Sequence, residues 1–178
     1  PERILAGELE KLAQSTDADD ATLRSARHDL QEQWKMAVAE HGPAPGALEG
    51  LRVIDMSTVL AGPNCARYLA DFGADVIKVE RPGGDSLRNM AWRDPRDGEG
   101  LWWKLVNRNK RTGVLDVKDE ADRAGLLQLV DGAHVLVENS RPGTMERLGL
   151  GPDVLLERNP ALVMTRISGF GQDGPYAS

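Results

Sequence analysis

Residues 51–80 decide the fold: LRVIDMSTVLAGPNCARYLADFGADVIKVE. The stretch opens with a short apolar run of strand length, Leu51–Met56, and closes with another, Asp75–Glu80. Between the two runs, Gly62-Pro63 is typical of a helix start, apolar residues recur at helical spacing, and Gly73 is placed to end the helix. The stretch therefore predicts a strand, a helix and a second strand, for which a right-handed parallel crossover is the default topology.

The rest of the chain repeats this alternation. We expect further helices over 101–106, 120–130 and 154–157, and further strands over 113–116, 133–138 and 161–167. The apolar run at 133–138 is the clearest buried strand of the sequence. Strands that alternate with helices predict an α/β domain, here a Rossmann-like and mostly parallel sheet flanked by helices.

The first 46 residues show no strand-like alternation. Leucines recur there at helical spacing, which predicts an N-terminal helical hairpin that serves as an arm or linker. The segment 41–46 is dense in Gly and Pro and marks a boundary, so we expect an arm over 1–46 and a main domain over 47–178. The chain starts at Pro1 and stops within a turn-rich segment, so we expect it to be a fragment of a longer protein.

Composition restricts the class of protein. Lys and Arg total 22 against 28 Asp and Glu, a net charge of −6, which argues against a surface built for nucleic acid and makes any anion site local. The single Cys65 has no partner for an internal disulfide, and no apolar run reaches the roughly 18 residues of a membrane span. We expect a cytoplasmic protein with no membrane or nucleic-acid partner.

Polar or glycine-rich segments follow three of the predicted strands. In open parallel sheets, ligands bind outside the carboxyl ends of the strands, and here these ends lead into 57–63, 81–85 and 139–143. The first segment leads into a helix N-terminus, which suits an anion. A fourth segment, 107–111, holds three cations and two amides; it is either a phosphate site or a solvated turn.

Other ligands and chemistries have weaker support. Glu80 stands roughly where a dinucleotide fold binds the ribose of NAD, but the first turn holds one Gly where that fingerprint needs three. The three histidines are scattered and Cys65 is solitary on an apolar helix face, so we predict no metal site and no covalent role for these residues. Trp92, Trp102 and Trp103 are assigned to core packing rather than to adenine stacking.

Several segments resemble one protein family in order and in spacing. They are Leu48–Asp55, Ala61–Pro63, Leu69–Gly83, Asn107–Arg111, Leu136–Asn139, Arg141–Gly143 and Ser168–Gly171. Together they are similar to the opening of the family III CoA-transferases, a group that includes formyl-CoA and carnitine CoA-transferases and the α-methylacyl-CoA racemases. Leu60 stands where formyl-CoA transferases have a Gln, which argues against a formyl or oxalate specificity.

The resemblance implies that CoA, as substrate and acyl carrier, binds on the predicted rim, and it implies no metal. By motif position, the CoA-binding residues would be Val59, Leu60, Ala61, Arg81, Leu115, Lys118, Asn139, Ser140 and Arg147. The first three would line the thioester and pantetheine path. The three cations would address the phosphates or the adenine end, and the remaining residues would border the same ligand.

For the parent protein, the resemblance implies a CoA-transferase that moves CoA between an acyl-CoA and a carboxylic acid. An Asp carboxylate would attack the thioester, forming a mixed anhydride and then an enzyme–CoA thioester. That Asp is expected after Ser178, so we expect no catalytic residue within the chain. A racemase that moves an α-proton, and a non-catalytic CoA-binding or assembly fragment, are the alternatives. The family also implies an interlocked homodimer.

Overall fold

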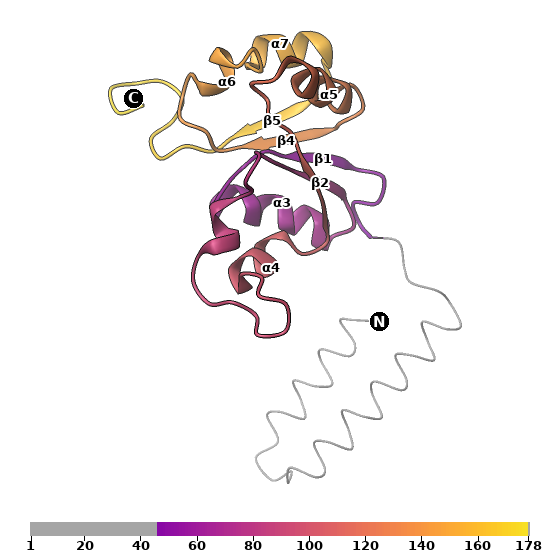
Figure 1. The fold of residues 1–178 in the computed structure, drawn as a ribbon. Helices are drawn as coiled ribbons and strands as arrows, with labels where there is room; N and C mark the ends of the chain where they lie inside the picture. Colours follow the sequence, from indigo (N-terminus) through magenta and orange to yellow (C-terminus); the bar gives the residue numbers. More distant parts are fainter. Residues whose placement is uncertain (1–45, 178) are drawn as a thin grey trace, which may run out of the picture. The chain divides into compact units, whose positions relative to one another are not determined.

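A five-stranded sheet lies between two layers of helices in the computed structural model, which describes residues 46–177 (Figure 1). The predicted helical hairpin therefore lies outside the described residues. The elements in chain order are β1 (Arg52–Asp55), α3 (Ala61–Asp71), β2 (Asp75–Glu80), the 3-10 helix η1 (Ser86–Asn89), α4 (Leu101–Asn107), β3 (Lys110–Val114), α5 (Glu120–Asp131), β4 (Val135–Glu138), α6 (Thr144–Arg147), α7 (Pro152–Arg158) and β5 (Val163–Arg166).

The sheet has the strand order β3-β2-β1-β4-β5, and every neighbouring pair is parallel. This confirms the predicted α/β fold with its parallel sheet. The chain leaves β1 toward β2 and β3 on one side and later adds β4 and β5 on the other. The order therefore reverses at β1 and β4, and a crevice is expected outside the carboxyl ends of these two strands.

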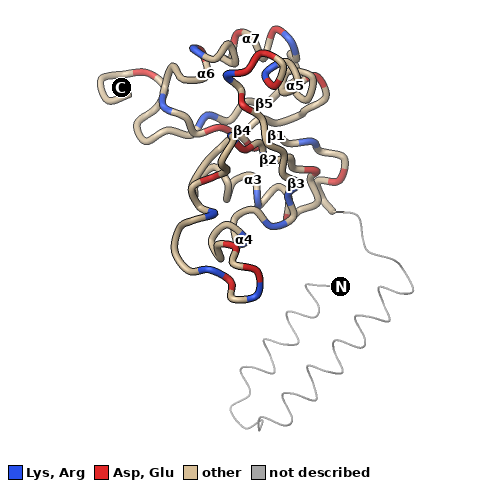
Figure 2. The backbone as a smooth tube through the Cα atoms, in the orientation of Figure 1, with Lys and Arg blue, Asp and Glu red and all other residues tan. Residues whose placement is uncertain are grey.

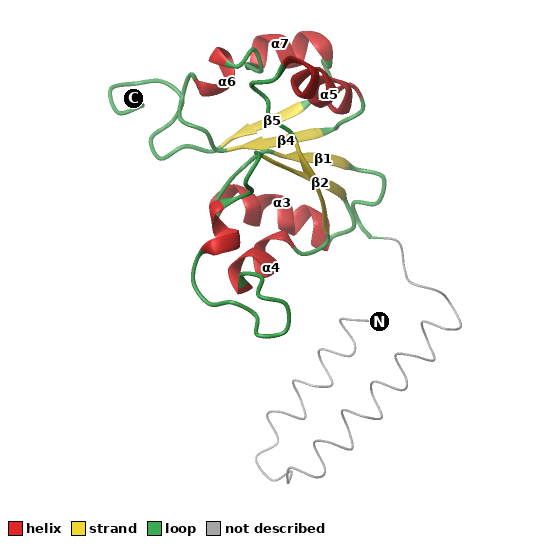
Figure 3. Ribbon diagram, viewed as in Figure 1, coloured by secondary structure: helices red, strands yellow, loops and turns green. Residues whose placement is uncertain are grey.

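Each face of the sheet buries its own apolar cluster because strand side chains alternate between faces. Val53 and Val76 point toward α3, where they pack with Ala66 and Ala70. Ile54 and its neighbours point the other way, toward α5 and α7. Figure 3 shows α3 and α4 on one side of the strands and α5, α6 and α7 on the other.

Two of the expected boundaries are wrong. β3 begins at Lys110 rather than at Gly113, because the chain pairs with β2 as soon as it leaves α4. Pro63 is the third residue of α3 rather than the first. The short helices η1 and α6 were not expected, since four residues are too few to show a periodic pattern.

The ends of α3 follow the expected chemistry. Gly73 has a positive φ of 100° directly after the helix, and its N–H group donates to the carbonyl of Ala70. A side chain there would meet the backbone of Gly46, so glycine is needed on two counts. Within residues 46–177, no helix has the length and apolar character needed to cross a membrane.

Candidate functional site

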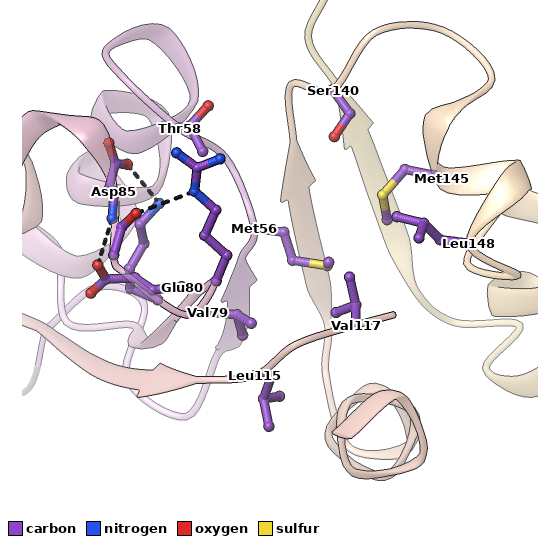
Figure 4. Close-up of a pocket in the computed structure, with 13 residues that line it drawn as sticks. Met56, Thr58, Val79, Glu80, Asp85, Leu115, Val117, Ser140, Met145 and Leu148 are labelled. Carbon is purple, nitrogen blue, oxygen red and sulfur yellow. Dashed lines mark hydrogen bonds and ion pairs between the residues drawn. The ribbon is translucent and has the colours of Figure 1, made fainter. Parts of the chain in front are cut away.

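A cavity of about 140 Å³ opens at the carboxyl ends of β1, β2, β3 and β4, the edge of the sheet at which the sequence places a ligand (Figure 4). Its walls are mostly apolar, and its polar groups come from the end of β2 and from the loops after the strands. The lining residues are Met56, Thr58, Lys78, Val79, Glu80, Arg81, Gly84, Asp85, Leu115, Val117, Ser140, Met145 and Leu148. An apolar trough with a few polar groups is the common form of a small-molecule site.

The loop between β1 and α3 forms one wall of this cavity through Thr58. The side chain of Asn139, which follows β4, grips the Thr58 backbone: the Thr58 N–H donates to Asn139 Oδ1 and Asn139 Nδ2 donates to the Thr58 carbonyl, both at 2.8 Å. Val59 has a φ of 66°, a conformation that β-branched residues rarely adopt. The hydrogen bonds from the Asn139 side chain therefore hold the loop in a strained conformation.

The same loop presents donors that have no acceptor. Within residues 46–177, nothing accepts a hydrogen bond from the backbone N–H groups of Val59, Leu60, Ala61 and Gly62. No side chain caps the start of α3 either. An exposed row of N–H groups at a helix start attracts negative charge or a polarised oxygen.

Four buried charges lie behind the loop, on the α3 side of the sheet. Asp55 and Lys78 are register partners on β1 and β2, and Lys110 reaches them from β3. Lys110 Nζ donates to Asp55 Oδ2 at 2.8 Å, and Lys78 Nζ lies 3.6 Å from Asp85 Oδ2. Burial lowers the pKa of Lys110, and the Asp55 charge opposes that shift. Two carboxylates and two ammonium groups balance, so the cluster is a neutral network and no free anion site.

Glu80 occupies the position that would hold the ribose in a dinucleotide fold, but its carboxylate is already engaged. Arg88 donates to both of its oxygens, at 2.8 and 2.6 Å, and the Asp85 N–H donates at 2.9 Å. Burial acts to raise the pKa of Glu80, but these hydrogen bonds outweigh it and hold the pKa below its ordinary value. The structure thus offers no free acid for the hydroxyls of an NAD ribose.

The structure gathers the predicted site residues unevenly. Arg81, Leu115 and Ser140 line the cavity. Directly beyond Thr58 lie Val59, Leu60 and Ala61, of which the first two have exposed side chains. The Asn139 side-chain amide is hydrogen-bonded to the backbone of the loop. Lys118 and Arg147 do not line the cavity, although each adjoins a residue that does (Val117 and Leu148).

Other lining residues were missed in the sequence. Met145 and Leu148 belong to α6 and its C-terminal cap, an element too short to predict. Lys78 and Asp85 are charged residues within or near a predicted strand, where the apolar pattern gave no reason to select them. The available signal was their position near the carboxyl end of a strand: Lys78 is two residues before that end, and Asp85 is in the loop that follows it.

The basic segment 107–111 does not form a phosphate site. It lies at the amino end of β3, the edge opposite the cavity, and its three cations are all paired with aspartates. Arg108 binds Asp71, Lys110 binds Asp55, and Arg111 binds Asp75. Figure 2 shows the same mixing of basic and acidic positions in the loop before α4. Two aspartates of that loop, Asp94 and Asp97, each lie 2.6 Å from Lys104 of α4.

A second cavity, of about 320 Å³, lies between the amino ends of the strands and α5. It is larger, and of its two arginines, Arg52 and Arg111, the second donates to both oxygens of Asp75, at 2.9 and 2.6 Å. We favour the first cavity because the unpaired N–H groups and the switch point both lie at the carboxyl edge.

The remaining candidate residues have structural roles. His134 Nδ1 accepts a hydrogen bond from the Arg52 N–H, and Cys65 packs against the α3 cluster. Trp103 is buried as expected, whereas Trp92 is 77% and Trp102 39% exposed, so core packing is wrong for these two residues. In the part of the chain that the structure describes, no three His, Cys, Asp or Glu side chains are grouped to hold a metal ion.

Comparisons with known proteins identify the family of this chain. The model of "CoA-transferase family III" matches residues 48–178. A succinyl-CoA:mesaconate CoA-transferase from Haloarcula hispanica is 50% identical over 129 residues, which cover 71% of this chain and 33% of that protein. A succinyl-CoA–D-citramalate CoA-transferase from Chloroflexus aurantiacus is 46% identical over 133 residues, 74% of this chain and 33% of that protein.

Solved structures give the same answer for the fold. The crystal structure of Rv3272 from Mycobacterium tuberculosis in its orthorhombic form has a TM-score of 0.72 and 41% identity, covering 76% of this chain and 38% of that one. A CAIB/BAIF family protein from Brucella suis has a TM-score of 0.71 and 36% identity, covering 75% of this chain and 36% of that one. The chain spans about a third of the length of the curated relatives it matches.

Proposed function

The chain belongs to CoA-transferase family III, and from that premise we propose that its carboxyl-edge cavity binds the CoA part of an acyl-CoA. The parent protein would then transfer CoA from an acyl-CoA to a carboxylic acid. The observation that carries the proposal is the coincidence of one cavity with the switch point of the sheet, an unengaged arginine at its rim and a loop of unpaired N–H groups. The CoA-transferases among the relatives support the same reaction.

The cavity suits the two chemically different ends of CoA. Arg81 is exposed at the mouth. Within residues 46–177 its side chain donates one hydrogen bond, a long one of 3.4 Å to the Gly84 carbonyl, so its guanidinium can turn toward phosphate. Met56, Val117 and Met145 offer an apolar surface to the pantetheine chain. We assign Lys118 and Arg147, which border the cavity from outside, to the phosphates as well.

The chemical step needs a nucleophile that this chain is not expected to contain. We propose that an Asp of the parent protein, beyond Ser178, attacks the thioester carbon while the thioester oxygen gains negative charge. The N–H groups of Val59 to Gly62 are the donors that this chain could offer to such an oxygen, because they point from a helix start and have no acceptor of their own within residues 46–177. In this scheme the chain binds and orients the acyl-CoA, and the proposed Asp of the parent protein attacks it.

Transfer of label tests the activity of the parent protein. Incubation with succinyl-CoA labelled in its CoA part and a panel of dicarboxylic acids should give a labelled product thioester and free succinate. Succinyl-CoA is chosen because two of the similar transferases are named for it. Racemisation of an α-methylacyl-CoA without any transfer to any acid would contradict the proposal and favour the isomerase.

Calorimetric titration with CoA tests the binding site on the chain itself. Arg81→Ala should weaken CoA binding about tenfold, the usual effect of losing one charged contact to phosphate. Arg111→Ala is the matched control, since it removes an arginine from the other cavity, at the opposite edge. Equal affinities in wild type and Arg81→Ala, with a loss in Arg111→Ala, would contradict the assignment of the cavity.

A further inference from the structure

The buried charges behind the β1–α3 loop have no role in the function proposed so far. Lys110 Nζ donates three hydrogen bonds, to Asp55 Oδ2 at 2.8 Å, to the Pro63 carbonyl at 2.7 Å and to Asn107 Oδ1 at 3.0 Å. An ammonium group has three donors, so none is left for a ligand. The side chain is 0% exposed and cannot touch one.

Lys78 makes an equivalent contact at the other end of the loop. Its Nζ donates to the Ser57 carbonyl and lies 3.8 Å from Asp55 Oδ1. Ser57 in turn donates to Asp55 through both its N–H group and its hydroxyl. One buried network is therefore hydrogen-bonded to the backbone at both ends of the loop, to Ser57 at its start and to Pro63 at its end.

We propose that Lys110 and Lys78 are positioning residues that hold the loop 57–63 in the one shape that presents its N–H groups to the thioester end of bound acyl-CoA. This inference rests on the proposed function. Lys110 acts through the Pro63 carbonyl and does not line the cavity, whereas Lys78, which does line it, acts through the Ser57 carbonyl. Asn139 secures the middle of the loop through Thr58.

The strained conformation of the loop is the reason that it needs such anchors. A β-branched residue in the left-handed region is strained and persists only where its surroundings enforce that conformation, and Val59 has a φ of 66°. Gly62 closes on Ser57 so tightly that an added Cβ would lie 2.2 Å from the Ser57 Cβ. Without its anchors, the loop would relax and the donors of Val59 to Gly62 would no longer converge.

Apolar residues could fill the same space, but they could not bind the carbonyls. Burying two lysines is costly unless each charge is paired, and here Asp55 and Asp85 balance both of them. The network is thus suited to fix a backbone shape, since its hydrogen bonds end on the loop and its charges cancel.

The test compares two ligands that share one end. The affinity of the 178-residue chain is measured for acetyl-CoA, which carries the thioester, and for adenosine 3′,5′-bisphosphate, the nucleotide part without pantetheine and thioester. Lys110→Met should weaken acetyl-CoA binding about tenfold, equivalent to the loss of one buried hydrogen bond to the loop. Affinity for the bisphosphate should stay within about twofold, because the phosphate contacts are elsewhere.

A second variant guards against misfolding. Lys110→Met leaves the Asp55 charge uncompensated, whereas Asp55→Asn combined with Lys110→Met leaves Lys78 and Asp85 as a balanced pair and should fold. The double variant is expected to show the same selective loss. Lys104→Met is the matched control: it removes a lysine that binds two aspartates beside α4, and both affinities should stay at wild-type values.

The outcomes separate the inference from the proposed function. A wild-type chain that binds neither ligand overturns both. If the wild type binds both ligands and the double variant binds acetyl-CoA as tightly as wild type, the positioning role alone is wrong. An equal loss for both ligands also overturns it, because a merely structural role would weaken the whole site.

Discussion

At the scale of single residues, this Rossmann-like sheet uses its strand ends differently from a dinucleotide-binding one. Glu80 ends β2 at the ribose position, yet it pairs with Arg88, whose guanidinium also stacks 3.7 Å from the centre of the Trp103 ring. This arrangement orders the turn that carries Arg81. The missing glycines indicated from the sequence that Glu80 is not a ribose ligand. The pairing of Glu80 with Arg88 could not be predicted, because it depends on η1.

The Glu80–Arg88 pair makes stability depend on pH. The pKa of Glu80 is below its ordinary value of 4.5 in the folded chain, so the pair stabilises the fold above that value and the contribution is lost as the pH falls through the folded pKa. Glu80→Gln should lower the free energy of unfolding by about 2 kcal/mol at pH 7, and by progressively less as the pH falls below 4.5. Urea unfolding between pH 7 and pH 3 measures both effects.

Glu99→Gln is the control for this prediction. Glu99 lies 3.3 Å from the same guanidinium but its side chain is 46% exposed, so its loss should cost about 0.5 kcal/mol or less. A difference between wild type and Glu80→Gln that stays constant across the pH range would contradict the account of the pair.

At the scale of elements, strands and helices with a clear period could be predicted and local contacts could not. The apolar runs gave β1, β2 and β4, and the Gly73 stop gave the end of α3. β3 was misplaced because its first residues are charged, and only the register with β2 shows that Lys110 faces a buried aspartate. The rim residues Arg81 and Ser140 could be predicted from strand ends, whereas Met145 depends on a four-residue helix.

The cap of α5 gives a prediction at this scale. Asp119 accepts hydrogen bonds from the N–H groups of Ala121 and Asp122, at 2.9 and 3.1 Å. Asp119→Ala should therefore lower the free energy of unfolding by about 1 kcal/mol. Asp153→Ala, in the uncapped first turn of α7, is the matched control and should cost about 0.5 kcal/mol or less. Equal losses in urea unfolding would show that the cap contributes nothing.

At the scale of the whole molecule, the chain spans about a third of the length of its curated relatives, and we propose that it contributes their CoA-binding edge. The homodimer, the cytoplasmic location and the domain boundary after residue 46 stay predictions. We expect the chain alone to bind CoA without transferring it, since the proposed nucleophile lies beyond Ser178. Label transfer by the chain alone, measured beside the parent protein, would contradict this division of labour.

The most direct test of the central claim is the site at which CoA binds. Amide chemical shifts of the isotope-labelled chain, followed during titration with CoA, should move at Thr58, Arg81, Leu115 and Ser140, which line the carboxyl-edge cavity. Residues of the other cavity, such as Arg111 and Gly132, should stay unchanged. Shifts confined to that second cavity, or no shifts at saturating CoA, would contradict the account.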